Sequence, residues 1–351
     1  EDHVGQKVED IQKYQIDIFT VGSDWIGAFD YLKQYCQVIY LERTKDVSST
    51  MLRARNFPII KLGIIGCGRI ATRMVPEVKY VSGIYVEGVY NPHIESAERF
   101  ADKCELNFYT DDLKEFFENI DAVYIASPHD THYTYAKEAL LNGKHVLCEK
   151  PIASSAQELE RMMKAADGNG KILLEAMRPV FDPGFAKIKE LLGQLGQIRR
   201  AVFQYCQYSS RYDAFKNGII ENAFNPALSN AALMDIGVYC IHPMVLLFGK
   251  PRQVMASGIF LPNHMEGAGT VLMDYGSMLG EVRYSKITDS AQPSEIQGED
   301  ANMLIWQIQD TRKIQVTYRG GRQETFEIQK EDNNMYYEVQ RMMELTQQDG
   351  G

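Results

Sequence analysis

The segment that decides the fold spans residues 59–71 and reads IIKLGIIGCGRIA. Its first seven residues form a nearly unbroken apolar run, which is typical of a buried strand in a parallel sheet. The following Gly66, Gly68 and Ala71 form a Gly-x-Gly-x-x-Ala pattern at the start of a helix. Gly66 permits a tight turn, Gly68 lets the backbone approach a pyrophosphate, and the small Ala71 allows close helix packing. The stretch therefore predicts a dinucleotide-binding turn, with phosphates at the helix N-terminus.

Strands and helices alternate downstream of this turn. We expect strands over residues 84–90, 107–109, 122–126, 145–148 and 171–175. Helices are expected between them, over residues 94–103, 111–118 and 133–142, and after a capping box that runs from Ser155 to Glu158. This alternation predicts an α/β fold with a Rossmann-type doubly wound parallel sheet.

The pattern changes after residue 180. Helices are expected over residues 185–195, 231–248 and 335–346, and a strand over 198–207. Short alternating runs then predict strands over residues 254–260, 270–275, 280–285, 302–307, 313–318 and 324–328, with Gly320 and Gly321 forming a hairpin turn. We expect an α+β domain with a largely antiparallel sheet. The predicted domains are residues 58–178 for dinucleotide binding and 179–351 for substrate binding and oligomerisation, preceded by a partial domain over 1–57. In this partial domain we expect strands over residues 16–21 and 37–41 and a helix over 24–35.

Composition narrows the class of protein. The 351 residues are 45% apolar and 24% charged, and 37 basic against 47 acidic residues leave a net charge of -10. The sequence has no cluster of basic residues of the kind that binds nucleic acids. No apolar run approaches the ~20 residues of a membrane span. No signal peptide is visible, so we expect a soluble, cytoplasmic protein. The six cysteines are scattered, without disulfide or metal-ligand spacing, so no metal is expected.

The end of the second strand, Asn91-Pro92-His93, bears on coenzyme choice. A carboxylate here would accept bonds from the ribose hydroxyls of NAD. Asn91 can bond a ribose but brings no charge to repel a 2′-phosphate, and Arg69 is either a phosphate ligand or an exposed helix-start arginine. The sequence leaves NAD or NADP open.

Five ordered motifs resemble the glucose-fructose oxidoreductase/inositol dehydrogenase/MocA family of NAD(P)-dependent oxidoreductases. They are the motifs at residues 66–71, 126–132 (ASPHDTH), 148–151 (CEKP), 175–178 (EAMR) and 235–239 (DIGVY). The resemblance implies a cis peptide bond between Lys150 and Pro151. The residues expected at the cofactor are Gly66, Gly68, Arg69, Ile70, Ala71, Asn91, Ser127, Pro128, His132, Glu149, Lys150 and Arg178. His132 is expected either to contact the cofactor or to order its loop.

A second group of residues fits hydride transfer to or from a carbinol. Lys150 follows a buried strand at the edge where α/β sheets bind ligands; there its pKa is lowered, or it simply polarises the substrate oxygen. In the apolar stretch 231–248, Asp235, Tyr239 and His242 have i, i+4, i+7 spacing and share one helix face. A carboxylate there needs a polar partner, for which Lys150 or a substrate hydroxyl would serve.

Tyr239 stands where many relatives carry histidine, and this resembles the glucose-fructose oxidoreductase and dihydrodiol dehydrogenase branches. The resemblance implies that Tyr239 gives or takes the proton; the alternative is a packed core tyrosine. Lys150, Tyr239 and Asp235 are thus the expected catalytic residues, and they also bind substrate. His242 is expected to contact substrate or to hydrogen-bond in the core, and Arg211 to bind substrate oxygens or to pack in its loop.

Residues 16–25, 29–30, 38–44 and 47–50 resemble the C-terminal half of a glycerol-3-phosphate cytidylyltransferase. That family's His-x-Gly-His motif is absent, so this segment is not expected to transfer nucleotides by itself. We predict an oxidoreductase acting on a small-molecule sugar, polyol or derivative, with no nucleic-acid or membrane partner, as a homodimer or homotetramer. The alternatives are a non-catalytic dinucleotide or sugar sensor, and the reductase part of a bifunctional cytidylyltransferase-oxidoreductase.

Overall fold

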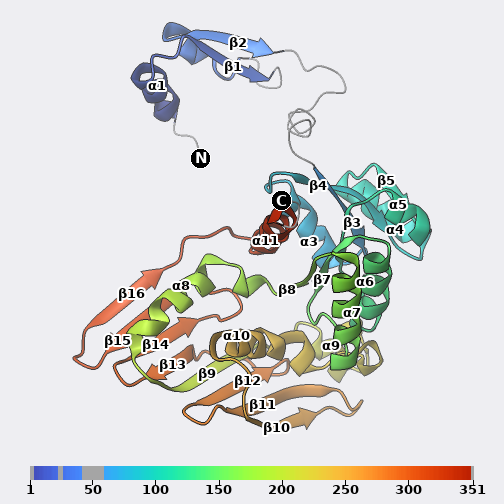
Figure 1. Cartoon of the computed structure of the whole chain (residues 1–351), viewed down its shortest axis with the longest axis vertical. Helices are drawn as coiled ribbons and strands as arrows, with labels where there is room; N and C mark the ends of the chain where they lie inside the picture. Colours follow the sequence, from blue (N-terminus) through green and yellow to red (C-terminus); the bar gives the residue numbers. More distant parts are fainter. Residues whose placement is uncertain (1–3, 23–26, 42–58, 349–351) are drawn as a thin grey trace. The chain divides into compact units, whose positions relative to one another are not determined.

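The computed structural model describes residues 4–22, 27–41 and 59–348 and divides into two units, Glu1–Ile59 and Ile60–Gly351. The first unit contains α1 (Val4–Lys13), β1 (Ile18–Gly22), the 3-10 helix η2 (Asp30–Gln34) and β2 (Gln37–Leu41) (Figure 1). The two strands are parallel, and both match predicted strands. Helix α1 was not predicted, and the helix expected over 24–35 is, within the described residues, only the short η2. The Arg43-Thr44 and Ser49-Thr50 motif lies outside the described residues.

The second unit begins with a six-stranded parallel sheet in the order β5-β4-β3-β6-β7-β8. Its strands are β3 (Ile60–Ile65), β4 (Ile84–Tyr90), β5 (Phe108–Thr110), β6 (Ala122–Ile125), β7 (His145–Glu149) and β8 (Leu173–Ala176). Helices α3 (Arg69–Val78), α4 (Ile94–Cys104), α5 (Leu113–Glu118), α6 (His132–Leu141) and α7 (Ala156–Asn169) connect them. The predicted doubly wound Rossmann sheet is confirmed. Strand order reverses between β3 and β6, and ligands of such sheets bind at this switch point.

Packing on both faces of the parallel sheet explains why its strands have nearly continuous apolar sequences. Leu62 and Ile64 of β3 enter the hydrophobic core on one face, together with Tyr124 of β6. Ile65 of β3 and Val123 of β6 enter the core on the other face. Because successive side chains of a strand point to opposite faces, a strand covered on both sides needs apolar residues at nearly every position.

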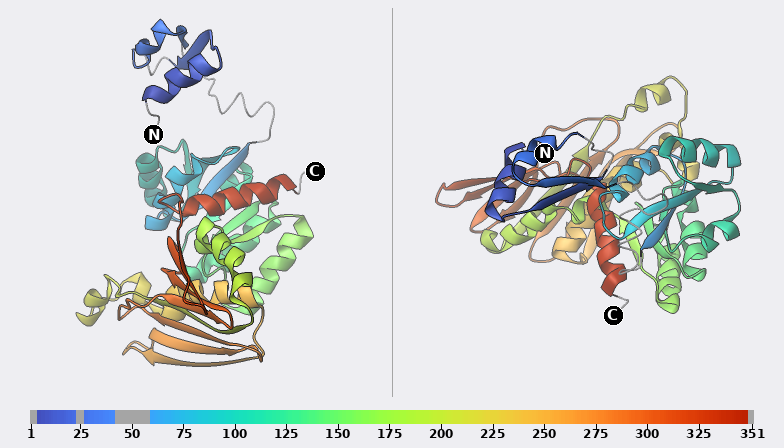
Figure 2. Two further views of the ribbon diagram at one scale, coloured as in Figure 1. Left: turned by 90° about the vertical axis from the view of Figure 1, so that its left-hand side faces the viewer. Right: turned by 90° about the horizontal axis from the view of Figure 1, so that it is seen from above.

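An eight-stranded sheet forms the rest of the unit, in the order β10-β11-β12-β9-β13-β14-β15-β16. Its strands are β9 (Ile198–Cys206), β10 (Gln253–Phe260), β11 (Glu266–Asp274), β12 (Leu279–Ser285), β13 (Ser294–Gly298), β14 (Ala301–Trp306), β15 (Lys313–Tyr318) and β16 (Gln323–Glu327). Neighbours are antiparallel except β9 and β12. Helices α8 (Pro183–Leu192) and α10 (Val238–Phe248) share a hydrophobic core with this sheet (Figures 1 and 2). The predicted antiparallel α+β part is confirmed; β13 and the short α9 (Tyr212–Lys216) were not predicted.

The last helix, α11 (Met335–Gln348), returns to the parallel sheet. It packs beside α3 (Figure 1), and Met335, Val339, Met342 and Met343 belong to the core formed with β3 and α3. The sequence analysis had grouped this helix with residues 179–351, because chain order alone does not reveal the return. In the described part of the chain, no helix is long and apolar enough to cross a membrane.

Candidate active site

The turn after β3 has the geometry that its glycines predict. Gly66 has a φ of 106°, and a Cβ atom on it would lie 2.6 Å from the carbonyl oxygen of Ala126. A Cβ atom on Gly68 would meet no protein atom within 4 Å, so the space before the N-terminus of α3 is open. Ala71 is fully buried behind this turn. The backbone amides of α3 and this open approach fit a dinucleotide pyrophosphate.

A cavity of about 1070 Å³ runs from this turn to the second sheet. It brings together most residues that the sequence analysis selected, which are Gly66, Gly68, Arg69, Ile70, Asn91, Ser127, Pro128, His132, Glu149, Lys150, Arg178, Arg211, Asp235 and Tyr239. Ala71 and His242 are absent from this lining. The cofactor turn and the expected chemical residues therefore share one cavity.

Lys150 lies where β7 ends, and its bond to Pro151 is cis, as the resemblance implied. Its ammonium donates to the Asp235 carbonyl oxygen at 2.7 Å and to Asp235 Oδ1 at 2.9 Å. Burial opposes this charge, but the neighbouring Tyr239 and Asp235 oxygens outweigh burial and hold the pKa of Lys150 above its ordinary value. The lowered pKa considered for this lysine is thus not found, and its ammonium is held as a fixed charge at the cavity.

Asp235 sits in a π-helical turn (Leu233–Gly237) that precedes α10. Its two carboxylate oxygens meet two lysines: Lys150 on Oδ1, and Lys286 on Oδ2 at 2.7 Å. Although burial opposes ionisation, both lysines favour the carboxylate, and the pKa of Asp235 lies well below its ordinary range. Lys286 is 3% exposed and also donates to the Ala223 carbonyl oxygen at 2.7 Å. Sequence reasoning assigned Lys286 no role.

The structure does not bring His242 to the cavity that Asp235 and Tyr239 line. The π turn interrupts the continuous helix expected over 231–248, so the assumed i, i+4, i+7 geometry does not apply across it. His242 lies one turn beyond Tyr239, and its Nε2 is 3.5 Å from Oε2 of Glu175. This favours the core role that the sequence analysis had left open for His242.

Tyr239 is 4% exposed and is surrounded by cations. Arg178 Nη2 donates to its hydroxyl oxygen at 2.8 Å, and Lys150 Nζ is 5.0 Å from its ring centroid. The ring of Tyr205 packs edge-on at 5.8 Å. The guanidinium therefore holds the Tyr239 hydroxyl oxygen in place at the cavity. The Arg178–Tyr239 contact was not predicted, since Arg178 was expected at the cofactor.

Two histidines shape the loop after β6. His132 is fully buried, with Nδ1 2.9 Å from the Pro151 carbonyl oxygen and Nε2 3.0 Å from that of Ser127. It therefore orders the loop, one of its two expected roles. His129 lines the cavity, and its buried Nδ1 has no partner among the described residues. Burial, with the nearby positive charges of His132 and Lys150, lowers the pKa of His129 to about 4. Sequence reasoning assigned it no role.

Arg211 lies at the substrate end of the cavity. Its Nε is 3.0 Å from Oε2 of Glu221, and the side chain is 40% exposed. The contact ties Arg211 to its own loop while leaving other guanidinium donors for a ligand. Both roles considered for Arg211 are compatible with this placement.

A Rossmann sheet, an open dinucleotide turn and a lysine–tyrosine pair in one cavity define an NAD(P)-dependent oxidoreductase. Residues 60–177 match the oxidoreductase family model with an NAD-binding Rossmann fold, and residues 185–304 match the GFO/IDH/MocA C-terminal domain. The chain belongs to the GFO/IDH/MocA family.

Relatives agree with this assignment. The chain is 42% identical to scyllo-inositol 2-dehydrogenase (NADP(+)) IolU of Bacillus subtilis (strain 168), over 82% of this chain and 88% of that protein. It is 36% identical to the uncharacterized oxidoreductase YgjR of Escherichia coli (strain K12), over 80% and 87%. The fold is similar to that of KijD10, a 3-ketoreductase from Actinomadura kijaniata, with a TM-score of 0.70 at 20% identity, covering 83% of this chain and 90% of that one.

Proposed function

We propose that this enzyme transfers hydride between the nicotinamide of NADP(H) and a carbinol or carbonyl carbon of a sugar or cyclic polyol. The observation that carries the proposal is the convergence of Lys150 and Tyr239 in the cavity that begins at the dinucleotide turn. The similarity to a scyllo-inositol 2-dehydrogenase supports a polyol as the substrate class.

The residues divide the proton chemistry between them. Nicotinamide, when bound, supplies or accepts the hydride. An ammonium has three N–H donors, and Lys150 gives two to Asp235, which leaves the third to polarise the substrate oxygen. Tyr239 takes the hydroxyl proton during oxidation and returns it during reduction. Arg178, which already donates to the Tyr239 oxygen, stabilises the phenolate that takes this proton during oxidation and that reduction restores.

Two substitutions test this division. Tyr239→Phe removes the proton carrier and should lower turnover roughly 10²–10⁴-fold with little change in coenzyme binding. Lys150→Met should lower turnover at least as much, because it removes the positive charge that polarises the substrate oxygen and that lies beside Tyr239. Tyr275→Phe is the control, since that hydroxyl contacts the Met273 sulfur at 3.7 Å, away from the cavity. Near-normal turnover of Tyr239→Phe would refute the role of this tyrosine.

A second, smaller cavity supports NADP as the coenzyme. It has a volume of about 410 Å³ beside Gly68 and Asn91, and its basic and polar lining includes His93, Ser96, Arg99 and Lys103. Arg99 Nη2 donates to Ser96 Oγ at 3.1 Å, so the guanidinium is already directed by a neighbour. Positive charge at the ribose end of the dinucleotide turn suits a 2′-phosphate.

The coenzyme proposal is tested by Arg99→Ala. A charge-assisted bond of about 1.5–3 kcal/mol predicts that the KM for NADP rises about tenfold or more, while the KM for NAD stays within about twofold. Arg341→Ala is the matched control, because that arginine pairs with Glu344 on the exposed side of α11. Equal effects of Arg99→Ala on both coenzymes would contradict a 2′-phosphate site here.

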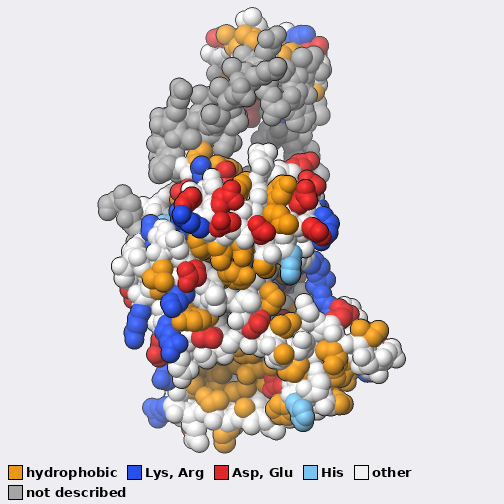
Figure 3. Space-filling model, turned by 90° about the vertical axis from the view of Figure 1, so that its right-hand side faces the viewer, with side chains coloured by type: hydrophobic (Ala, Val, Ile, Leu, Met, Phe, Trp, Pro, Cys, Tyr) orange, Lys and Arg blue, Asp and Glu red, His pale blue; other side chains and the backbone are white. Residues whose placement is uncertain are grey.

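We also propose that two copies associate through β10, in a homodimer or homotetramer. β10 is an edge strand without charged residues, and Val254, Met255, Ile259 and Phe260 on it are 53–67% exposed. Figure 3 shows apolar side chains on the surface of the part of the molecule that carries this sheet. A second copy would cover the apolar side chains and pair the open strand edge. Sedimentation at micromolar concentration should show the oligomer, and Ile259→Lys should dissociate it; a wild-type monomer would overturn the proposal.

The N-terminal unit supports a finer proposal, that the chain is the reductase part of a bifunctional protein and accepts a phosphorylated or CDP-linked polyol. The support is the cytidylyltransferase resemblance of residues 1–57 and the parallel β1–β2 pair. Reductase assays on free, phosphorylated and CDP-linked polyols test this. Turnover of free polyols alone would contradict it.

A further inference from the structure

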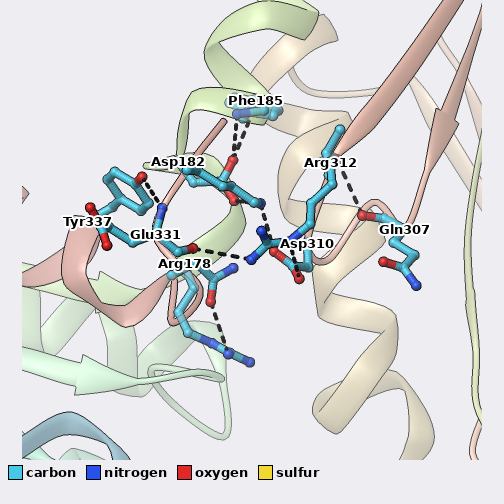
Figure 4. A network of polar contacts seen from close by, with 12 residues as sticks. Arg178, Asp182, Phe185, Gln307, Asp310, Arg312, Glu331 and Tyr337 are labelled. Carbon is cyan, nitrogen blue, oxygen red and sulfur yellow. Dashed lines mark hydrogen bonds and ion pairs between the residues drawn. The ribbon is translucent and has the colours of Figure 1, made fainter. Parts of the chain in front are cut away.

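The segment between β16 and α11, residues 328–334, is called the C-terminal strap here. Its third residue, Lys330, has a fully buried side chain. The ammonium is 2.6 Å from Asp182 Oδ2 and 2.7 Å from Asp310 Oδ1 (Figure 4). Asp182 also caps α8 by accepting from the Gly184 and Phe185 amides. The strap is therefore fixed to the start of α8 and to the loop that carries Asp310.

Further contacts hold the strap on both sides of Lys330. Arg312 Nη2 donates to the carbonyl oxygens of Glu331 and Asp332 at 3.2 and 3.3 Å. The amide of Glu331 donates to the Tyr337 hydroxyl at 2.9 Å, which links the strap to α11 (Figure 4). The residues that follow Asp332 are thus placed by several independent contacts.

The strap ends at Asn334, which lies against Arg178. Arg178 Nη1 donates to Asn334 Oδ1 at 3.2 Å, while Nη2 of the same guanidinium donates to the Tyr239 hydroxyl oxygen at 2.8 Å. Asn334 is 4% exposed. A guanidinium is a rigid planar fork, so fixing one nitrogen also limits where the other can point.

The surroundings leave the charge of Arg178 available to Tyr239. Glu338, one turn into α11, is fully buried, and its carboxyl oxygens have no hydrogen-bond partner among the described residues. Burial, and then the Glu149 carboxylate, raise the pKa of Glu338, although Arg178 opposes them. Burial thus disfavours a Glu338 carboxylate that would compete with a phenolate for the guanidinium, and Asn334 is the neutral acceptor on the other nitrogen of Arg178.

We propose that Asn334 is a positioning residue for proton transfer: it holds Arg178 against Tyr239 and thereby makes the C-terminal strap part of the catalytic apparatus. The inference rests on the proposed role of Tyr239. Asn334 touches neither the substrate nor the reacting atoms in this scheme, since its effect passes through the guanidinium.

A double-mutant cycle on the full chain tests the proposal. Asn334→Ala should lower kcat about tenfold, since it releases one end of a charge-assisted bond network, and should leave KM and coenzyme affinity within about twofold. In the Tyr239→Phe background the same substitution should produce no further loss. Asn169→Ala is the matched control, because this asparagine caps an exposed helix end by donating to the Ala165 carbonyl oxygen at 2.8 Å. If Asn334→Ala does not fold, Asn334→Ser, which is too short to reach Arg178, takes its place in the cycle.

The outcomes separate the two ideas. An equal loss from Asn334→Ala in both backgrounds, or a loss confined to KM or coenzyme affinity, overturns the positioning role and leaves the proposed function intact. Near-normal turnover of Tyr239→Phe alone refutes the proton role of the tyrosine and the inference together.

Discussion

Replacing Asp235 with asparagine perturbs the charge centre of the cavity. The carboxylate serves two ammonium groups, Lys150 at 2.9 Å and Lys286 at 2.7 Å. Asparagine keeps the size of the side chain but offers one acceptor oxygen, and its amide nitrogen would face the other lysine, donor against donor. Both buried ammonium groups would then lose their counter-ion, and one of them would also face an N–H donor. We expect the variant to be less stable and less active, because Lys150 loses its anchor.

The size of the loss follows from burial. The lysine side chains are 12% and 4% exposed, but the Asp235 side chain is 29% exposed. Because the pair is only partly shielded from water, we take the lower end of the range for breaking a buried ion pair, and the free energy of unfolding should fall by about 3 kcal/mol. At about 2 °C per kcal/mol for a unit this large, the melting temperature should fall by about 6 °C. Since folding lowers the pKa of Asp235, its stabilisation is fully present above the unfolded value of about 3.9 and is lost as the pH falls through the folded value. The difference between wild type and variant should therefore shrink below about pH 4.

Urea unfolding of both proteins at a series of pH values measures this difference. Asp332→Asn provides the matched control, because its fully exposed carboxylate is 3.6 Å from Arg312 and should contribute little to stability. A difference below about 1 kcal/mol for Asp235→Asn at pH 7, or one that does not shrink toward acid pH, would refute the reasoning.

Three further predictions concern other parts of the second unit. Gly68→Val should weaken NADPH binding at least about tenfold in a fluorescence titration while leaving the melting temperature unchanged, because the valine side chain would fill space that is open in the protein. An unchanged affinity would show that the cofactor does not bind at this turn. Lys330→Met should lower the free energy of unfolding by about 3–5 kcal/mol in urea, since two carboxylates lose a fully buried counter-ion. A decrease below about 1 kcal/mol would show that other contacts hold the strap in place. His129 should titrate near its lowered pKa of about 4 in NMR spectra. Because the unfolded state binds this proton from about pH 6.5, His129→Asn should reduce the loss of stability between that pH and 4, and an unchanged slope would contradict the assignment.

The parallel sheet was predictable because its strands are covered on both faces, which forces apolar runs such as that of β3. The antiparallel part was harder. β13 (Ser294–Gly298) is short and largely polar, so its sequence carries little strand signal. The π turn at Leu233–Gly237 could not be predicted from the sequence either, since the surrounding apolar residues fit a continuous helix equally well.

The candidate site was predictable where local motifs specify it. The glycine turn and Lys150 each follow a strand directly, and sheet topology places such positions at one edge. Contacts across long sequence separations were not visible: Lys150 and Asp235 are 85 residues apart, and Arg178 and Tyr239 are 61 apart. Lys286 directly follows β12, which contacts the π turn that carries Asp235, and periodicity alone does not reveal that contact.

The return of α11 to the parallel sheet has a consequence for synthesis of the protein. Met335, Val339, Met342 and Met343 are at most 4% exposed and complete a core whose other members lie between residues 62 and 176. Although domains generally fold from the N-terminus as they leave the ribosome, this dinucleotide-binding core cannot close until its last helix has emerged. The strands of the antiparallel sheet are translated in the interval, while apolar surface on α3 remains uncovered. A chaperone that binds nascent chains would find this surface available until residues 335–348 have been synthesised.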